Sequence, residues 1–87
     1  MKILAIFNES SVPKNGLNPV IKIYDLSTNE IVINNELMIG IGDGQYIYNF
    51  IGCNETIDYS VICDSQILTG SEKYAYAIIS FKKYRFK

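Results

Sequence analysis

The sequence of 87 residues contains no histidine and no tryptophan, and it has only two cysteines. Without histidine, the chain cannot assemble a Ser-His-Asp triad or a Cys-His nucleophilic pair. Cys53 and Cys63 are ten residues apart, which is not a zinc-binding spacing. The missing tryptophan removes the Cys…Trp…Cys signature of antibody-type domains. We therefore expect a protein that is not an enzyme and that has no catalytic residues, cofactor or metal site.

Long apolar runs and an excess of charge are missing as well. No apolar stretch approaches the roughly 18–20 residues that a transmembrane helix needs. The apolar opening, residues 1–7, stops at Asn8-Glu9 without the cleavage site of a secretory signal. The formal net charge is −1, so no overall field draws the chain to nucleic acid or to an anionic membrane. We expect no nucleic-acid or membrane partner and an unprocessed cytoplasmic product.

The residues that are abundant favour β structure. The chain has 15 Ile, 7 Tyr and 4 Phe but only 3 Ala. Branched and aromatic side chains suit a pleated, half-buried surface, whereas Ala favours helix. A chain of this length forms one domain with one thin core. We expect a single β-domain over residues 1–87, with residues 81–87 as a possible docking tail.

Apolar and polar residues alternate with a period of two, and turn residues separate the short runs. The pattern predicts seven strands, at residues 2–7, 19–25, 30–33, 37–41, 45–51, 58–64 and 74–81. Residues 10–18 and 65–73 read as loops, and Asn34-Asn35 and Gly42-Asp43-Gly44 as turns. Seven such strands predict an all-β immunoglobulin- or transthyretin-like sandwich, with a small barrel as the main rival.

Three features are weak candidates for chemistry. Asp43, Asp58 and Asp64 could offer oxygens to Ca²⁺, but they lack the dense ligand run of a calcium loop. The glycines of residues 40–44 precede a strand, whereas phosphate-binding glycine loops open a helix. A hairpin turn or bulge explains these glycines better. The cysteines are expected as buried free thiols, and a disulfide between them stays open.

Aromatic and basic residues suggest two ways of binding a partner. The 7 Tyr and 4 Phe could form a sugar-stacking platform, although cross-strand packing in the sheets explains them more simply. The C-terminal segment alternates basic and aromatic groups and carries half of the basic residues. It is either a partner-binding segment or a strand edge guarded by lysine. The candidate partner-binding residues are Lys82, Lys83, Tyr84, Arg85, Phe86 and Lys87.

Residues 37–50, with the sequence LMIGIGDGQYIYNF, resemble a pattern known from tailed bacteriophages. The pattern is a methionine, a short turn, Gly-x-Gly and then Tyr-x-Tyr-x-Phe. It occurs in small immunoglobulin-like virion proteins and modules, including those of crAss-like phages. Residues 16–19, 58–61 and 72–74 fit the same pattern, and the resemblance covers roughly residues 16–76.

The resemblance implies a non-enzymatic structural protein of a phage virion, first of all an auxiliary or decoration protein of the capsid. Its partners would be other virion proteins, above all the major capsid protein. Its place would be the virion, after synthesis in the cytoplasm of the bacterial host. The single module favours a free-standing subunit over a fibre tip. Two alternatives stay open: a carbohydrate-binding or adhesion module, and a tail-associated virion protein.

Overall fold

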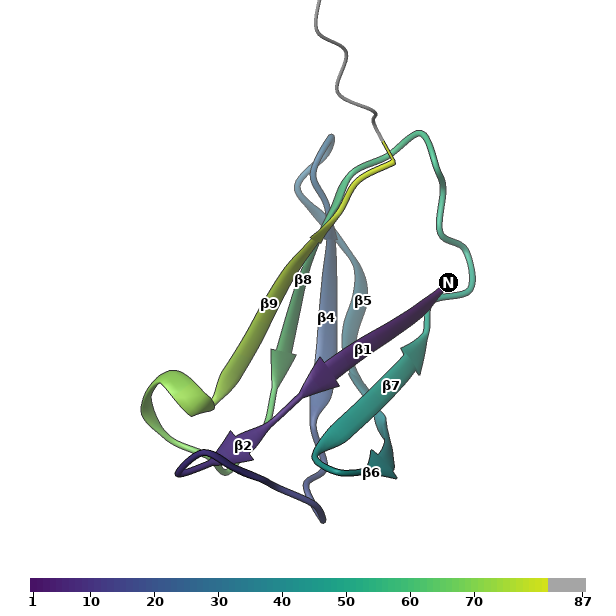
Figure 1. The fold of residues 1–87 in the computed structure, drawn as a ribbon. Coiled ribbons are helices and arrows are strands. Elements are labelled where there is room, and N and C mark those ends of the chain that lie inside the picture. The colour runs from purple at the N-terminus through teal and green to yellow at the C-terminus, as the bar shows by residue number, and fades with distance from the viewer. Residues whose placement is uncertain (82–87) are drawn as a thin grey trace, which may run out of the picture.

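The computed structural model describes residues 1–81, whose regular structure is almost entirely antiparallel β-strand (Figure 1). These residues contain no α-helix, and the one helical turn is the 3₁₀ segment η1 (Gly70–Glu72). The predicted all-β class is confirmed. The strands are β1 (Lys2–Ile6), β2 (Asn8–Glu9), β3 (Val12–Pro13), β4 (Val20–Asp25), β5 (Glu30–Leu37), β6 (Ile39–Gly42), β7 (Gln45–Asn49), β8 (Tyr59–Asp64) and β9 (Tyr74–Ile79).

The longer strands form two sheets. One has three strands in the order β1-β7-β6, and the other has four in the order β5-β4-β8-β9. The chain passes from the four-stranded to the three-stranded sheet at Met38, which separates β5 from β6. Its backbone amide donates a hydrogen bond of 2.9 Å to the carbonyl of Pro19, and its side chain is buried. Met38 therefore anchors the crossing between the sheets.

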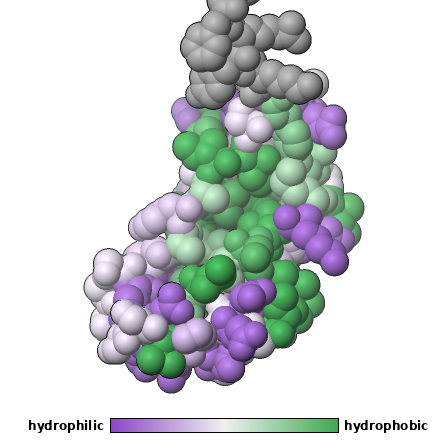
Figure 2. Space-filling model, in the orientation of Figure 1, coloured by the Kyte–Doolittle hydropathy of each residue, from purple (hydrophilic) through white to green (hydrophobic). Residues whose placement is uncertain are grey.

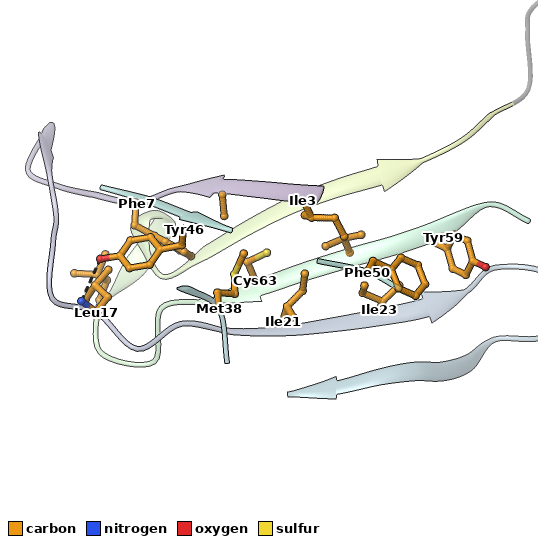
Figure 3. Close-up of a cluster of buried hydrophobic side chains, with 13 residues drawn as sticks. Ile3, Phe7, Leu17, Ile21, Ile23, Met38, Tyr46, Phe50, Tyr59 and Cys63 are labelled. Atoms are coloured by element: carbon orange, nitrogen blue, oxygen red, sulfur yellow. Dashed lines mark hydrogen bonds between the residues drawn. The ribbon is translucent and has the colours of Figure 1, made fainter. Parts of the chain in front are cut away.

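The hydrophobic core lies between the two sheets (Figure 3). In β4 every second residue is buried, so Ile21 and Ile23 face the core while Lys22 and Tyr24 face outward. A fully buried Ile contributes roughly 1.5–3 kcal/mol, and a one-residue slip would expose both side chains. The alternation thus fixes the register of the central strand. The core residues are Ile3, Ala5, Phe7, Leu17, Ile21, Ile23, Met38, Tyr46, Phe50, Tyr59, Val61, Cys63 and Leu68.

The predicted turn at Asn34-Asn35 is wrong, because β5 continues through both residues. Ile21 of β4 pairs with Glu36, but Ile23 pairs with Ile33, so β5 carries an extra residue there. Asn35 takes a φ of 54°, a left-handed conformation that asparagine tolerates well. The two asparagines therefore form a β-bulge, which bends the strand without ending it.

The predicted loop at residues 10–18 contains β3, which forms a small hairpin with β2 just before the loop. Its two central residues, Ser10 and Ser11, have φ values of 52° and 67°. Two successive positive φ values are typical of the tight turns that join antiparallel strands. Such turns usually contain Gly, Asn or Asp, so the Ser-Ser pair gave no signal for a hairpin.

Candidate functional site

The predicted partner-binding segment, residues 82–87, lies outside the described residues, and its role stays a prediction. The strand before it is shorter than expected, since β9 ends at Ile79 and the prediction ran to residue 81. The candidate site must therefore be sought on the surface of residues 1–81.

The glycine-rich stretch forms a hairpin turn between β6 and β7, as expected from its place before a strand. Asp43 and Gly44 have φ values of 55° and 70°. The amide of Gly44 donates a hydrogen bond of 2.8 Å to the side-chain oxygen of Asn15. This amide is therefore already bonded within the fold, and the stretch opens no helix.

The three aspartates considered for calcium do not form a site. Asp64 pairs with the Lys73 ammonium at 2.8 Å, while Asp43 lies in the β6–β7 turn. The carbonyl of Asp58 accepts a hydrogen bond from the amide of Leu26. Within residues 1–81, no three His, Cys, Asp or Glu side chains are grouped so that they could hold a metal ion.

Both cysteines are free thiols. Cys63 is buried in the core, as expected, whereas Cys53 is only half buried. Burial raises the pKa of the Cys63 thiol to about 11. Because the thiolate is the nucleophilic form, Cys63 is a poor nucleophile at neutral pH.

The outer face of the three-stranded sheet is apolar from edge to edge. Leu4 of β1 and Ile39 of β6 both pair with Ile47 of β7, so the three side chains form one row. Leu4 and Ile39 are exposed, Ile39 to 66 %. Figure 2 shows apolar surface gathered over this sheet. We call this surface the isoleucine face, and its residues are Leu4, Ile6, Ile39, Ile41 and Ile47.

The outer face of the four-stranded sheet has a different character. It is hollowed, with a cavity of about 360 Å³ that three tyrosines help to line. Tyr24 comes from β4, and Tyr74 and Tyr76 come from β9. We call this cavity the tyrosine hollow. Its polar lining residues are Lys22, Asn35 and Asp64.

A chain of polar contacts holds one side of the tyrosine hollow. The Lys73 ammonium donates hydrogen bonds to Asp64 Oδ1 at 2.8 Å and to the Tyr74 hydroxyl at 3.1 Å. The Asp64 hydrogen bond is the main reason why the pKa of Lys73 is raised. Burial opposes ionisation of Asp64, but the bonds from Lys73 and the Gln66 amide outweigh it, so the pKa of Asp64 is lowered. Both groups are therefore charged at neutral pH.

The sequence left open whether its tyrosines form an exposed platform, and it did not show which of them gather. The alternation in residues 19–25 already places Lys22 and Tyr24 on one face. Residues 74 and 76 likewise share a face of the last strand. What the sequence does not contain is the strand order β4-β8-β9, which brings these four residues to one surface.

Comparison with known proteins gives no match: no family model, no curated protein and no solved structure is significantly similar to this chain. None of the helical structure within residues 1–81 is long and apolar enough to cross a membrane. The function must therefore be argued from the two sheet faces and from the resemblance described above.

Proposed function

We propose that this chain is a non-enzymatic structural protein of a phage virion, in first place an auxiliary or decoration protein of the capsid. The resemblance over residues 16–76 motivates the proposal. The chain folds into two sheets that face each other across one core, which supports a more specific proposal: that the fold is an immunoglobulin- or transthyretin-like sandwich. The proposed location is the virion, after synthesis in the host cytoplasm.

The isoleucine face is the observation that carries the proposal. Five apolar side chains share the outer face of a sheet of only three strands. A contiguous apolar surface on a small domain marks an interaction site, because leaving it in water is unfavourable. Lys2 and Asn49 pair at one end of this sheet, and Gln45 pairs with Ile6 at the other. An apolar centre with polar ends is typical of a protein–protein interface.

The proposed partner is another virion protein, above all the major capsid protein. An apolar surface offers no charge with which to bind nucleic acid, whose recognition depends on Lys and Arg. Residues 82–87 remain a proposed second contact, because their aromatic and Arg side chains are common anchors of interfaces.

Mass spectrometry of purified phage particles tests the proposal directly. We expect the protein in intact particles, in a copy number that scales with that of the capsid protein. Absence from intact particles contradicts a virion role. A copy number that scales with tail proteins instead supports the tail-associated alternative.

A binding assay with particles stripped of the protein tests the isoleucine face. Ile39→Lys places a charge at the exposed end of the apolar row, on β6, and should reduce binding at least tenfold. Ile78→Lys is the matched control, since Ile78 is also exposed on an edge strand but belongs to the other sheet. A third variant that ends at Phe81 tests the C-terminal segment. Equal binding of Ile39→Lys and Ile78→Lys would show that the isoleucine face is not the interface.

A second candidate function is a carbohydrate-binding or adhesion module. The tyrosine hollow favours it, because exposed aromatic rings beside polar side chains form the surfaces on which sugars stack. A glycan array separates the two candidates: tyrosine-dependent binding of glycans supports the second. The two functions need opposite faces of the molecule and can be tested independently.

A further inference from the structure

The tyrosine hollow combines an aromatic wall with a charged floor. Tyr76 pairs with Ile62 of β8, which in turn pairs with Lys22 of β4, so these side chains form one row across the sheet. Neighbouring strands lie about 4.8 Å apart, so the backbones of Tyr76 and Lys22 are roughly 10 Å apart. The cavity of about 360 Å³ lies within the usual size range of small-ligand sites.

One of the two rings in the aromatic wall is held in place before any ligand binds. The rings of Tyr74 and Tyr76 have centroids 5.8 Å apart and planes inclined by 32°. The Lys73 ammonium lies 4.3 Å from the centre of the Tyr74 ring and also bonds its hydroxyl. Tyr74 is therefore fixed, whereas the neighbouring Tyr76 is 70 % exposed. The Tyr74 ring therefore loses little side-chain entropy on binding, and the exposed Tyr76 ring offers the accessible face.

The floor of the hollow carries one uncompensated positive charge. Asp64 is paired with Lys73, so these two charges balance. Lys22 is half buried and has no ion-pair partner within the part of the chain that the structure describes. An unpaired ammonium in a partly desolvated hollow favours an anionic ligand. The amide of Asn35 adds neutral hydrogen-bonding groups nearby.

We infer that the tyrosine hollow binds an acidic saccharide, such as a uronic acid residue of a polysaccharide. The C–H groups on one face of the pyranose ring stack on Tyr76 and Tyr74, whose ring faces are electron-rich. The sugar carboxylate pairs with the Lys22 ammonium. This inference rests on the second candidate function and makes no use of the isoleucine face.

Isothermal titration calorimetry with two probes tests the inference: trigalacturonic acid and the neutral galactose trisaccharide of the same linkage. The wild-type protein should bind the acidic probe at least tenfold more tightly than the neutral one. Tyr76→Ala should weaken binding of both probes at least tenfold. Lys22→Met keeps the apolar stem of the side chain and should abolish the preference for the acidic probe. Ile78→Ala, on the same strand and face but outside the lining, should bind like the wild type.

Several results would overturn the inference. Absence of binding to either probe by folded wild-type protein is one, and equal affinity for the two probes is another. A third is sedimentation of the wild type as a dimer that Tyr76→Ala dissociates, which would make the hollow an interface between copies. Circular dichroism must show that each variant is folded. The outcome is separable from the particle assay, since Ile39→Lys should leave saccharide binding unchanged.

Discussion

The hydroxyl of Tyr46 accepts a hydrogen bond of 3.1 Å from the backbone amide of Leu17, 29 residues earlier in the chain (Figure 3). The same hydroxyl donates a bond of 2.7 Å to the carbonyl of Lys14. The Tyr46 ring packs edge-on against Phe7, with ring centroids 5.8 Å apart. One buried side chain thus ties the loop before β4 to the three-stranded sheet.

Replacing Tyr46 by Phe should lower the free energy of unfolding by about 1–3 kcal/mol. The ring and its packing stay, but the buried amide of Leu17 and the carbonyl of Lys14 lose their partner. Urea unfolding followed by circular dichroism measures the change. Tyr76→Phe is the control, because Tyr76 is largely exposed, and it should change the free energy by less than about 0.5 kcal/mol. Equal effects of the two substitutions would contradict the assigned role of the hydroxyl.

Gly44→Ala should be among the most damaging single substitutions in the chain. Gly44 has a φ of 70°, and an added Cβ would lie 2.5 Å from the carbonyl oxygen of Phe7. The same oxygen accepts a hydrogen bond from the Lys14 amide, so it cannot move away without weakening that bond. We expect a loss of at least about 2 kcal/mol in the free energy of unfolding.

Gly52→Ala is the matched control for Gly44→Ala. Gly52 also has a positive φ, 86°, but nothing lies within 4 Å of an added Cβ. Only the backbone strain remains, which costs about 1–2 kcal/mol. If both alanine variants unfold at the same urea concentration, the close approach to Phe7 does not determine the choice of glycine at position 44.

The inner faces of the strands could be read from the sequence because period-two alternation is a local property. Period two in the predicted strand at residues 58–64 puts Tyr59, Val61 and Cys63 on one face, and all three are buried. The bulge at Asn34-Asn35 was missed, because a left-handed asparagine serves a turn or a bulge equally well. Only the pairing with β4 decides between them, and that pairing depends on residues far along the chain.

The candidate surfaces were less predictable than the core. Leu4, Ile39 and Ile47 belong to three separate runs, and nothing in any one run says that the strands are neighbours. The tyrosine hollow has the same origin, since Tyr24 and Tyr76 lie on the two strands that flank β8 and line one cavity. A prediction of burial does not need to know which inner residues contact each other across the core. A prediction of the surface does need to know which outer residues are neighbours, and the strand order determines this.

The stability of the fold should fall in acid partly through Asp25. The Ser27 hydroxyl donates a bond of 2.6 Å to Asp25 Oδ1, and this bond is the main cause of the lowered pKa of Asp25. A carboxyl whose pKa is lowered by folding stabilises the fold above its unfolded pKa, near 3.8. This stabilisation is lost as the pH falls through the lower, folded pKa.

Ser27→Ala tests this acid dependence. The difference in unfolding free energy between the wild type and Ser27→Ala should be larger at pH 6 than at pH 2.5, in urea titrations at both values. Asp25→Asn provides the control background, since an amide does not titrate, and there the effect of Ser27→Ala should not depend on pH. A wild-type difference that is the same at both pH values would contradict the role given to Asp25.

The two thiols should differ in reactivity. The titration that measures this difference also shows whether the two cysteines are oxidised. Cys63 is 3 % exposed and has a pKa of about 11, so roughly 0.1 % of it is thiolate at pH 8. Cys53 lies half buried at the edge of the core. In the folded protein, titration with a chromogenic disulfide reagent at pH 8 should show one fast thiol. The second should react only after urea is added.

Variants assign the two phases of the thiol titration. Cys53→Ala should remove the fast phase, and Cys63→Ala should leave it unchanged. Cys63 reacts slowly because it is buried, so in the folded state it can react only when the core opens. Its reaction rate should therefore increase in variants that destabilise the fold, such as Tyr46→Phe. Two fast thiols would show that Cys63 is accessible. A protein that shows no thiol in urea until a reductant is added would contain a Cys53–Cys63 disulfide, contrary to the free thiols of this structure.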